Sequence, residues 1–133
     1  MSAQLRTPLK IARGLGSARS GAHHFMVQRI TAVALIGLCL WIVWIALEML
    51  HMEYAAARAL LAQPLNAVLM ISFLIASFWH AQLGLQVVIE DYVHTRWLEL
   101  ASQIAVKFLC FLGAAASVLA VLRIALASST LGS

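Results

Sequence analysis

The apolar residues of this chain fall into three long blocks that polar segments separate. The blocks cover about residues 30–50, 65–90 and 104–126. A helix that crosses a bilayer needs roughly 20 apolar residues, each adding about 1.5 Å along its axis. All three blocks reach that length, and no alternating strand pattern with turns appears. Backbone polar groups in lipid must be satisfied internally, so the pattern predicts an all-α integral membrane protein with three transmembrane helices.

Composition supports this prediction. Of the 133 residues, 63% are hydrophobic and only 11% are charged, whereas an ordinary soluble domain carries about 25% charged residues. A soluble fold of this length has no interior large enough for so much apolar surface. We therefore divide the chain into an N-terminal arm (1–28), one transmembrane domain (29–127) and a short tail (128–133).

The positive charges predict an orientation. The segment before the first block contains five basic residues and no acidic one: Arg6, Lys10, Arg13, Arg19 and Arg29. Positively charged segments stay in the cytoplasm. Three spans then place the N-terminus in the cytoplasm, the first loop outside, the second loop inside and the C-terminus in the periplasm. We expect a multi-pass protein of a bacterial inner membrane.

The basic arm is not a typical secretory signal. Such a signal has an apolar stretch of about 7–15 residues and a cleavage site of small residues. The first apolar block here is longer and reaches Glu48 without such a site. We interpret residues 1–28 as a retained cytoplasmic arm. A mitochondrial transit peptide, which is also basic and poor in acidic residues, remains an alternative.

His80 is the only one of the five histidines that lies deep in an apolar block. An ionisable side chain at that depth is a candidate functional residue. Ser72, Ala76 and Gly84 share its helix face at intervals of four. Small residues on one face favour close helix packing, with His80 as a packing residue. They equally suit a flat macrocycle, for which histidine is a common axial ligand. A six-coordinate haem then takes its second ligand from another chain.

Asp91 and Tyr92 extend this side of the helix to the inner surface. Asp91 lies eleven residues, or about three turns, after His80. An interfacial tyrosine is often an aromatic anchor, and an interfacial aspartate is often only solvated. A quinone, however, needs a hydrogen-bond donor and a proton source. A phenol and a carboxylate supply these two functions.

Arg29 begins the first block on the same side of the membrane. It is equally interpretable as a snorkelling positive-inside anchor or as a cation facing a haem propionate or a quinone head group. The remaining histidines lie at or beyond the ends of the blocks, where solvated side chains are usual: His23, His24, His51 and His94. We assign none of them as an axial ligand.

Two runs of residues resemble a known family. GLGSARSGAHHFMVQRITAVAL (14–35) resembles the N-terminal signature of the hydrophobic membrane anchor of bacterial succinate dehydrogenase, in its alphaproteobacterial form. HAQLGLQVVIEDYVH (80–94) resembles the second-span signature of this family. The second run is the more specific, because it combines a histidine, a glycine four residues later and Asp-Tyr at eleven and twelve. The resemblance extends over essentially the whole chain, and the first-span motifs of the other anchor, the cytochrome b556 subunit, are absent.

The resemblance implies roles for five residues. His80 matches the axial ligand of haem b, and Tyr92 matches the tyrosine that hydrogen-bonds ubiquinone, with Asp91 beside it as a proton relay. Arg29 and His23 match positions near the haem propionates and the quinone pocket. The family works as respiratory complex II, in electron transport and the tricarboxylic acid cycle. Its flavoprotein oxidises succinate, its iron–sulfur subunit transfers electrons, and its cytochrome b556 subunit supplies the second haem histidine.

Two other functions remain open. A fumarate reductase anchor uses the same architecture, and the direction of the reaction depends on cofactors in other chains. A structural three-helix membrane subunit without a cofactor needs His80 only for packing. In every case succinate chemistry lies outside this chain.

Overall fold

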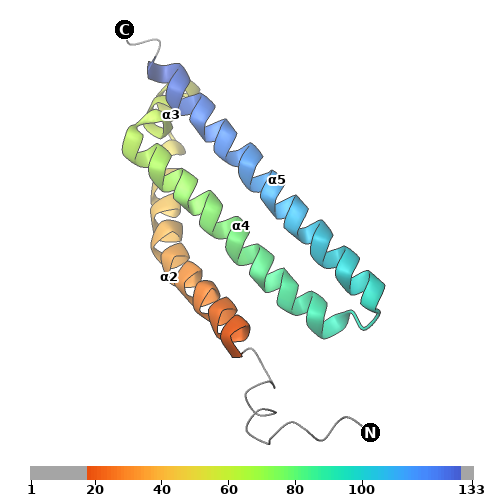
Figure 1. Cartoon of the computed structure of the whole chain (residues 1–133). Helices are drawn as coiled ribbons and strands as arrows, with labels where there is room; N and C mark the ends of the chain where they lie inside the picture. The colour runs from red at the N-terminus through yellow and green to blue at the C-terminus, as the bar shows by residue number, and fades with distance from the viewer. Residues whose placement is uncertain (1–17, 130–133) are drawn as a thin grey trace, which may run out of the picture.

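The computed structural model describes residues 18–129, which form four helices (Figure 1). They are α2 (Ala18–Met49), α3 (Tyr54–Ala62), α4 (Pro64–Tyr92) and α5 (Arg96–Ser129). Three segments are long and apolar enough to cross a membrane: Phe25–Met49, Pro64–Tyr92 and Arg96–Ala127. The predicted all-helical architecture with three potential spans is confirmed.

The helices extend beyond the predicted blocks. α2 begins at Ala18, inside the predicted arm, and α5 begins at Arg96, ahead of its apolar block. The division between arm and transmembrane domain at residue 28 therefore falls within a continuous helix. Residues 1–17 and 130–133, which include most of the predicted arm and tail, lie outside the described part of the chain.

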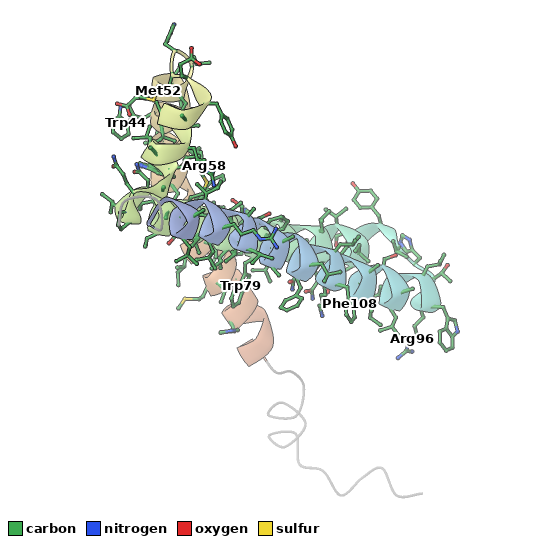
Figure 2. All side chains as sticks on the ribbon, turned by 90° about the horizontal axis from the view of Figure 1, so that it is seen from above. Trp44, Met52, Arg58, Trp79, Arg96 and Phe108 are labelled. Carbon is green, nitrogen blue, oxygen red and sulfur yellow. The ribbon has the colours of Figure 1, made fainter. Side chains whose placement is uncertain are left out.

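α4 is the central element, because it packs against both α2 and α5. α4 and α5 are antiparallel neighbours along their length, whereas the N-terminal half of α2 diverges from them (Figures 1 and 2). Among the side chains that the structure describes, three apolar ones are buried: Ile45, Ala67 and Leu83. The other described apolar side chains face outward or lie half-buried, the pattern of a chain that uses lipid or partner subunits in place of a core of its own.

The short helix α3 closes the end of the bundle opposite the N-terminal end of α2. It packs on α4 and α5 and ends one residue before Gln63, which precedes Pro64. Pro64 is the first residue of α4, where its fixed backbone angle suits a helix start. The buried Asn66 side chain donates a hydrogen bond of 2.8 Å to the carbonyl of Leu60, at the C-terminal end of α3. The same carbonyl also accepts the backbone N–H of Gln63 at 3.3 Å, so the Asn66 bond adds a second link between the end of α3 and the start of α4.

Candidate functional site

His80 lies near the middle of α4 and is half-buried against α2. Its Nδ1 is 3.1 Å from the hydroxyl oxygen of Thr31, which belongs to α2. Thr31 Oγ1 is also 2.9 Å from the carbonyl oxygen of Val27 and 3.0 Å from that of Gln28. Among the side chains that the structure describes, none is a hydrogen-bond partner of Nε2 of His80. One edge of the imidazole is therefore held, and the other is free to bind a ligand.

The space beside His80 is open on one side. Gly84 lies one turn after His80, so the two residues share a face of α4. A Cβ atom added to Gly84 meets nothing within 4 Å. The small residue therefore does not serve a close helix contact within this chain. The free edge of His80 and the open face at Gly84 together suit a flat ligand that lies against α4.

Asp91 and Tyr92 form the C-terminal end of α4. Both side chains are exposed, and Tyr92 is 78% exposed. α4 stops there because Val93 adopts an extended conformation, and α5 begins at Arg96. A carboxylate in the last turn of a helix is unfavourable by roughly 0.3–1 kcal/mol, because the helix dipole is negative at that end. Asp91 therefore has no role in stabilising its own helix.

Arg29 is exposed on α2. Its guanidinium lies 5.7 Å from the ring centroid of Phe25, one turn earlier on the same helix. Within residues 18–129, no ion pair joins Arg29 to Asp91. Arg29 precedes Thr31 by two residues, so its backbone lies at about the depth of His80, whereas Tyr92 is about 18 Å further along α4. The arginine is thus closer in depth to His80 than to the Asp91–Tyr92 pair.

A cavity of about 460 Å³ lies between α2, α4 and α5. His23 and Val27 line it from α2, Phe78 and Gln82 from α4, and Phe111 from α5. Leu83 also lines it and lies one turn after His80 on α4, and Val27 lies one turn before Thr31 on α2. The cavity is therefore next to the contact between Thr31 and His80, although His80 itself is not among its lining residues. His23 is brought to this cavity.

Sequence reasoning gave no role to Thr31 and did not predict the cavity. Both depend on which face of α2 meets α4, which hydropathy alone does not determine. The sequence held one signal for Thr31. It is a short polar side chain in the first apolar block, at about the depth of His80. His51 and His94 are exposed at the helix ends, as expected. No cluster of three metal-binding side chains occurs within residues 18–129.

Comparison with known proteins places the chain in a family. Residues 3–114 match the family model described as succinate dehydrogenase/fumarate reductase transmembrane subunit. The succinate dehydrogenase hydrophobic membrane anchor subunit of Rickettsia bellii is 36% identical over 121 residues, covering 91% of this chain and 97% of the relative. The corresponding protein of Rickettsia conorii is 33% identical, covering 82% and 87%. That of Paracoccus denitrificans is 30% identical, covering 65% and 67%. No solved structure matches the chain.

The match to the family model covers the first span, the His80 segment and the Asp91–Tyr92 segment. Together with the three membrane-spanning helices, the comparisons agree with the resemblance to an alphaproteobacterial membrane anchor. The chain therefore belongs to the succinate dehydrogenase/fumarate reductase transmembrane subunit family, as a hydrophobic membrane anchor of the succinate dehydrogenase type.

Proposed function

We propose that this chain holds one side of a haem b through His80 and forms part of a ubiquinone-reduction site at Tyr92, in the inner membrane of a bacterium. The observation that carries the proposal is the arrangement along α4. A half-buried histidine with a free ring nitrogen lies in mid-span, and an exposed Asp-Tyr pair lies at the end of the same helix. One helix thus connects a buried site for a redox group with a surface site for its electron-accepting partner.

The residues around His80 fit a haem. Nε2 is the nitrogen that remains available to iron, and the open face at Gly84 leaves room for a macrocycle against the helix. When bound, haem supplies reversible one-electron chemistry. In this proposal a histidine of another chain, the cytochrome b556 subunit, would hold the haem together with His80.

The end of α4 fits a quinone head group. Only two cysteines occur in the chain, Cys39 and Cys110, so it holds no iron–sulfur cluster of its own. Electrons must therefore arrive from a separate iron–sulfur subunit, which receives them from the flavoprotein that oxidises succinate. The quinone then lies near the surface to which that subunit binds. There Tyr92 donates a hydrogen bond to a quinone carbonyl, and Asp91 relays protons from the cytoplasm.

Arg29 is proposed as the cation that faces a haem propionate. Its depth supports this role over one in the quinone pocket, because its backbone lies at about the level of His80. Its guanidinium is exposed within this chain, and a charged group inside a span requires a partner. His23 lines the cavity from α2, and a role for it near the propionates remains a prediction from the resemblance alone.

The orientation follows the positive-inside rule. Docking of the iron–sulfur subunit on the cytoplasmic side requires Tyr92 and the loop before Arg96 to face the cytoplasm. The start of α2 lies at the same end of the molecule as this loop (Figure 1). The basic residues before the first span then also face the cytoplasm, which agrees with the charge rule.

Replacing Tyr92 with phenylalanine tests the proposal. The variant removes one hydroxyl from an exposed residue, so the complex is expected to assemble and retain its haem. Succinate oxidation measured with a dye that accepts electrons upstream should be unchanged. Quinone reduction should fall at least about tenfold, a loss of roughly 1.4 kcal/mol in transition-state stabilisation. The effect exceeds an ordinary net hydrogen bond if the bond strengthens as negative charge develops on the quinone oxygen.

Tyr54 provides a matched control. It is the other tyrosine of the chain, it is 80% exposed, and it begins α3 at the opposite end of the bundle. Tyr54→Phe should leave both assays unchanged. Wild-type quinone kinetics in an assembled Tyr92→Phe complex would leave Tyr92 as an interfacial anchor only.

A further inference from the structure

The contact between Thr31 and His80 is a hydrogen bond between the side chains of two different helices. Thr31 Oγ1 lies within hydrogen-bonding distance of three atoms: Nδ1 of His80 at 3.1 Å, the Val27 carbonyl oxygen at 2.9 Å and the Gln28 carbonyl oxygen at 3.0 Å. The threonine is half-buried. It therefore offers His80 a fixed partner inside the span, where water does not compete.

The distances allow this bond in two directions, because the role of Nδ1 depends on which ring nitrogen of His80 carries the hydrogen. A hydroxyl group has one hydrogen to donate and lone pairs with which to accept. The two carbonyl oxygens only accept, and both lie closer to Thr31 Oγ1 than Nδ1 of His80 does. When the threonine hydrogen is directed to one of these carbonyls, Nδ1 of His80 donates and the Thr31 oxygen accepts. In a neutral imidazole that carries its hydrogen on Nδ1, the other nitrogen has a free lone pair.

We propose that Thr31 is a positioning residue that holds His80 in the Nδ1–H tautomer, so that Nε2 is available to a metal. This inference rests on the proposed function, because it assigns a role to Thr31 only if His80 ligates haem iron. The other tautomer places a hydrogen on Nε2 and cannot ligate. A hydrogen bond to the outer nitrogen of a ligating histidine also fixes the ring orientation and raises the basicity of the ligand.

The side chain is suited to this task. Threonine is branched at Cβ, and its χ1 angle is restricted in a helix. The bond to the helix backbone fixes the hydroxyl further. The oxygen that meets His80 is therefore held by α2 itself, and the imidazole orientation is coupled to the packing of α2 on α4.

The test compares two substitutions in the assembled four-chain complex. Thr31→Val keeps the branched shape but has no hydroxyl, and Thr31→Ser keeps the hydroxyl. The readouts are haem retention, the electron paramagnetic resonance g-values of the oxidised haem and its midpoint potential. None of these depends on turnover.

We expect Thr31→Val to retain haem about tenfold less tightly, the lower end of the usual effect of losing such a partner. Because the weakened ligand stabilises oxidised iron less, the midpoint potential should rise. A tenfold change in the relative affinity for the two oxidation states corresponds to about 59 mV. Thr31→Ser should stay close to wild type in all three readouts.

Equal behaviour of the two variants would overturn the inference, whether both match wild type or both lose haem to the same extent, because the hydroxyl would then have no specific role. Failure of the proposed function gives a different result from failure of this inference. The wild-type complex would then contain no haem, or His80→Ala would show an unchanged haem spectrum. A change in Thr31→Val alone, with His80→Ala losing the spectrum, supports both.

Discussion

An imidazole in the middle of a membrane span is costly unless its polar atoms have partners. Burying an unpartnered polar group costs at least about 1–3 kcal/mol by typical mutational measures. At His80, Thr31 is the partner of one nitrogen, and the other has no partner among the described side chains. That nitrogen is not fully buried within this chain, so lipid or a bound group covers it in the membrane. A histidine that serves only helix packing would cost less if both ring nitrogens had hydrogen-bond partners, or if an apolar side chain stood in its place. The half-satisfied imidazole therefore favours a ligand-binding role.

Arg29 is a charged group inside a candidate span, so it also needs a partner there. Arg29→Gln should reduce haem retention about tenfold or more, because a hydrogen bond to a charged group contributes roughly 1.5–3 kcal/mol. Arg29→Lys should restore part of the loss, since it keeps the charge but not the bidentate geometry. The measurement is haem content per complex after prolonged washing.

Phe25→Leu serves as the control for Arg29. It removes the ring beneath the guanidinium and leaves the charge in place. Retention should then match wild type. If Arg29→Gln also retained haem normally while the protein still inserted correctly, Arg29 would be a positive-inside anchor.

At the scale of the helices, α4 carries most of the proposed site. It bears His80 and the open face at Gly84, and it lines a cavity with α2 and α5. α5 approaches α4 closely at Gly113, where an added Cβ would lie 2.6 Å and 2.9 Å from two atoms of the Phe78 ring. Phe78 also lines the cavity. The absence of a side chain at Gly113 thus allows α5 to pack on α4 and fixes the position of the Phe78 ring.

Gly113→Val should destabilise the packing of α5. The branched side chain overlaps the Phe78 ring, which must turn into the cavity or push α5 away. Overpacking of this kind costs about 1–3 kcal/mol. The thermal unfolding temperature of the purified complex should fall, and Phe78→Leu should restore part of it in the double variant.

Gly37→Val is the matched control for Gly113→Val. Gly37 lies in α2, and a Cβ added there meets nothing within 4 Å. The same substitution at this position should leave the unfolding temperature within experimental error. An equal loss at both positions would show that the glycine backbone, and not the contact with Phe78, is responsible.

The whole molecule is an open array of spans with almost no core of its own. Hydropathy predicts the three spans, because each apolar block is long enough to cross a membrane. It does not predict α3, because a nine-residue helix between Glu53 and Gln63 is too short and too polar at its ends to stand out. The prediction of His80 as a candidate residue rests on its depth in the apolar block. The pairing of His80 with Thr31 was not predicted, because it depends on the rotation of α2 about its axis.

The predicted topology determines on which side of the membrane a reporter fused at each position should be active. Fusions at Arg96 should be cytoplasmic, and fusions at Ala57 in α3 should be periplasmic. Gly14 and Ser133 lie outside the described residues, and the charge pattern predicts the cytoplasm for the first and the periplasm for the second. The measurement is a paired set of reporters active on only one side. A cytoplasmic Ser133 would mean that one of the three candidate spans does not cross.

The central claim is that the chain supplies an axial haem ligand from the middle of α4. The most direct measurement is the haem spectrum of the purified complex carrying His80→Ala, beside wild type and beside His51→Ala, which alters an exposed histidine just after the end of α2. Wild type and His51→Ala should show a low-spin b-type spectrum with two nitrogen ligands. In His80→Ala, with all subunits assembled, that spectrum should be lost or replaced by a five-coordinate form. An unchanged low-spin spectrum in His80→Ala, or a colourless wild-type complex, would contradict the claim and leave His80 as a packing residue of a structural membrane protein.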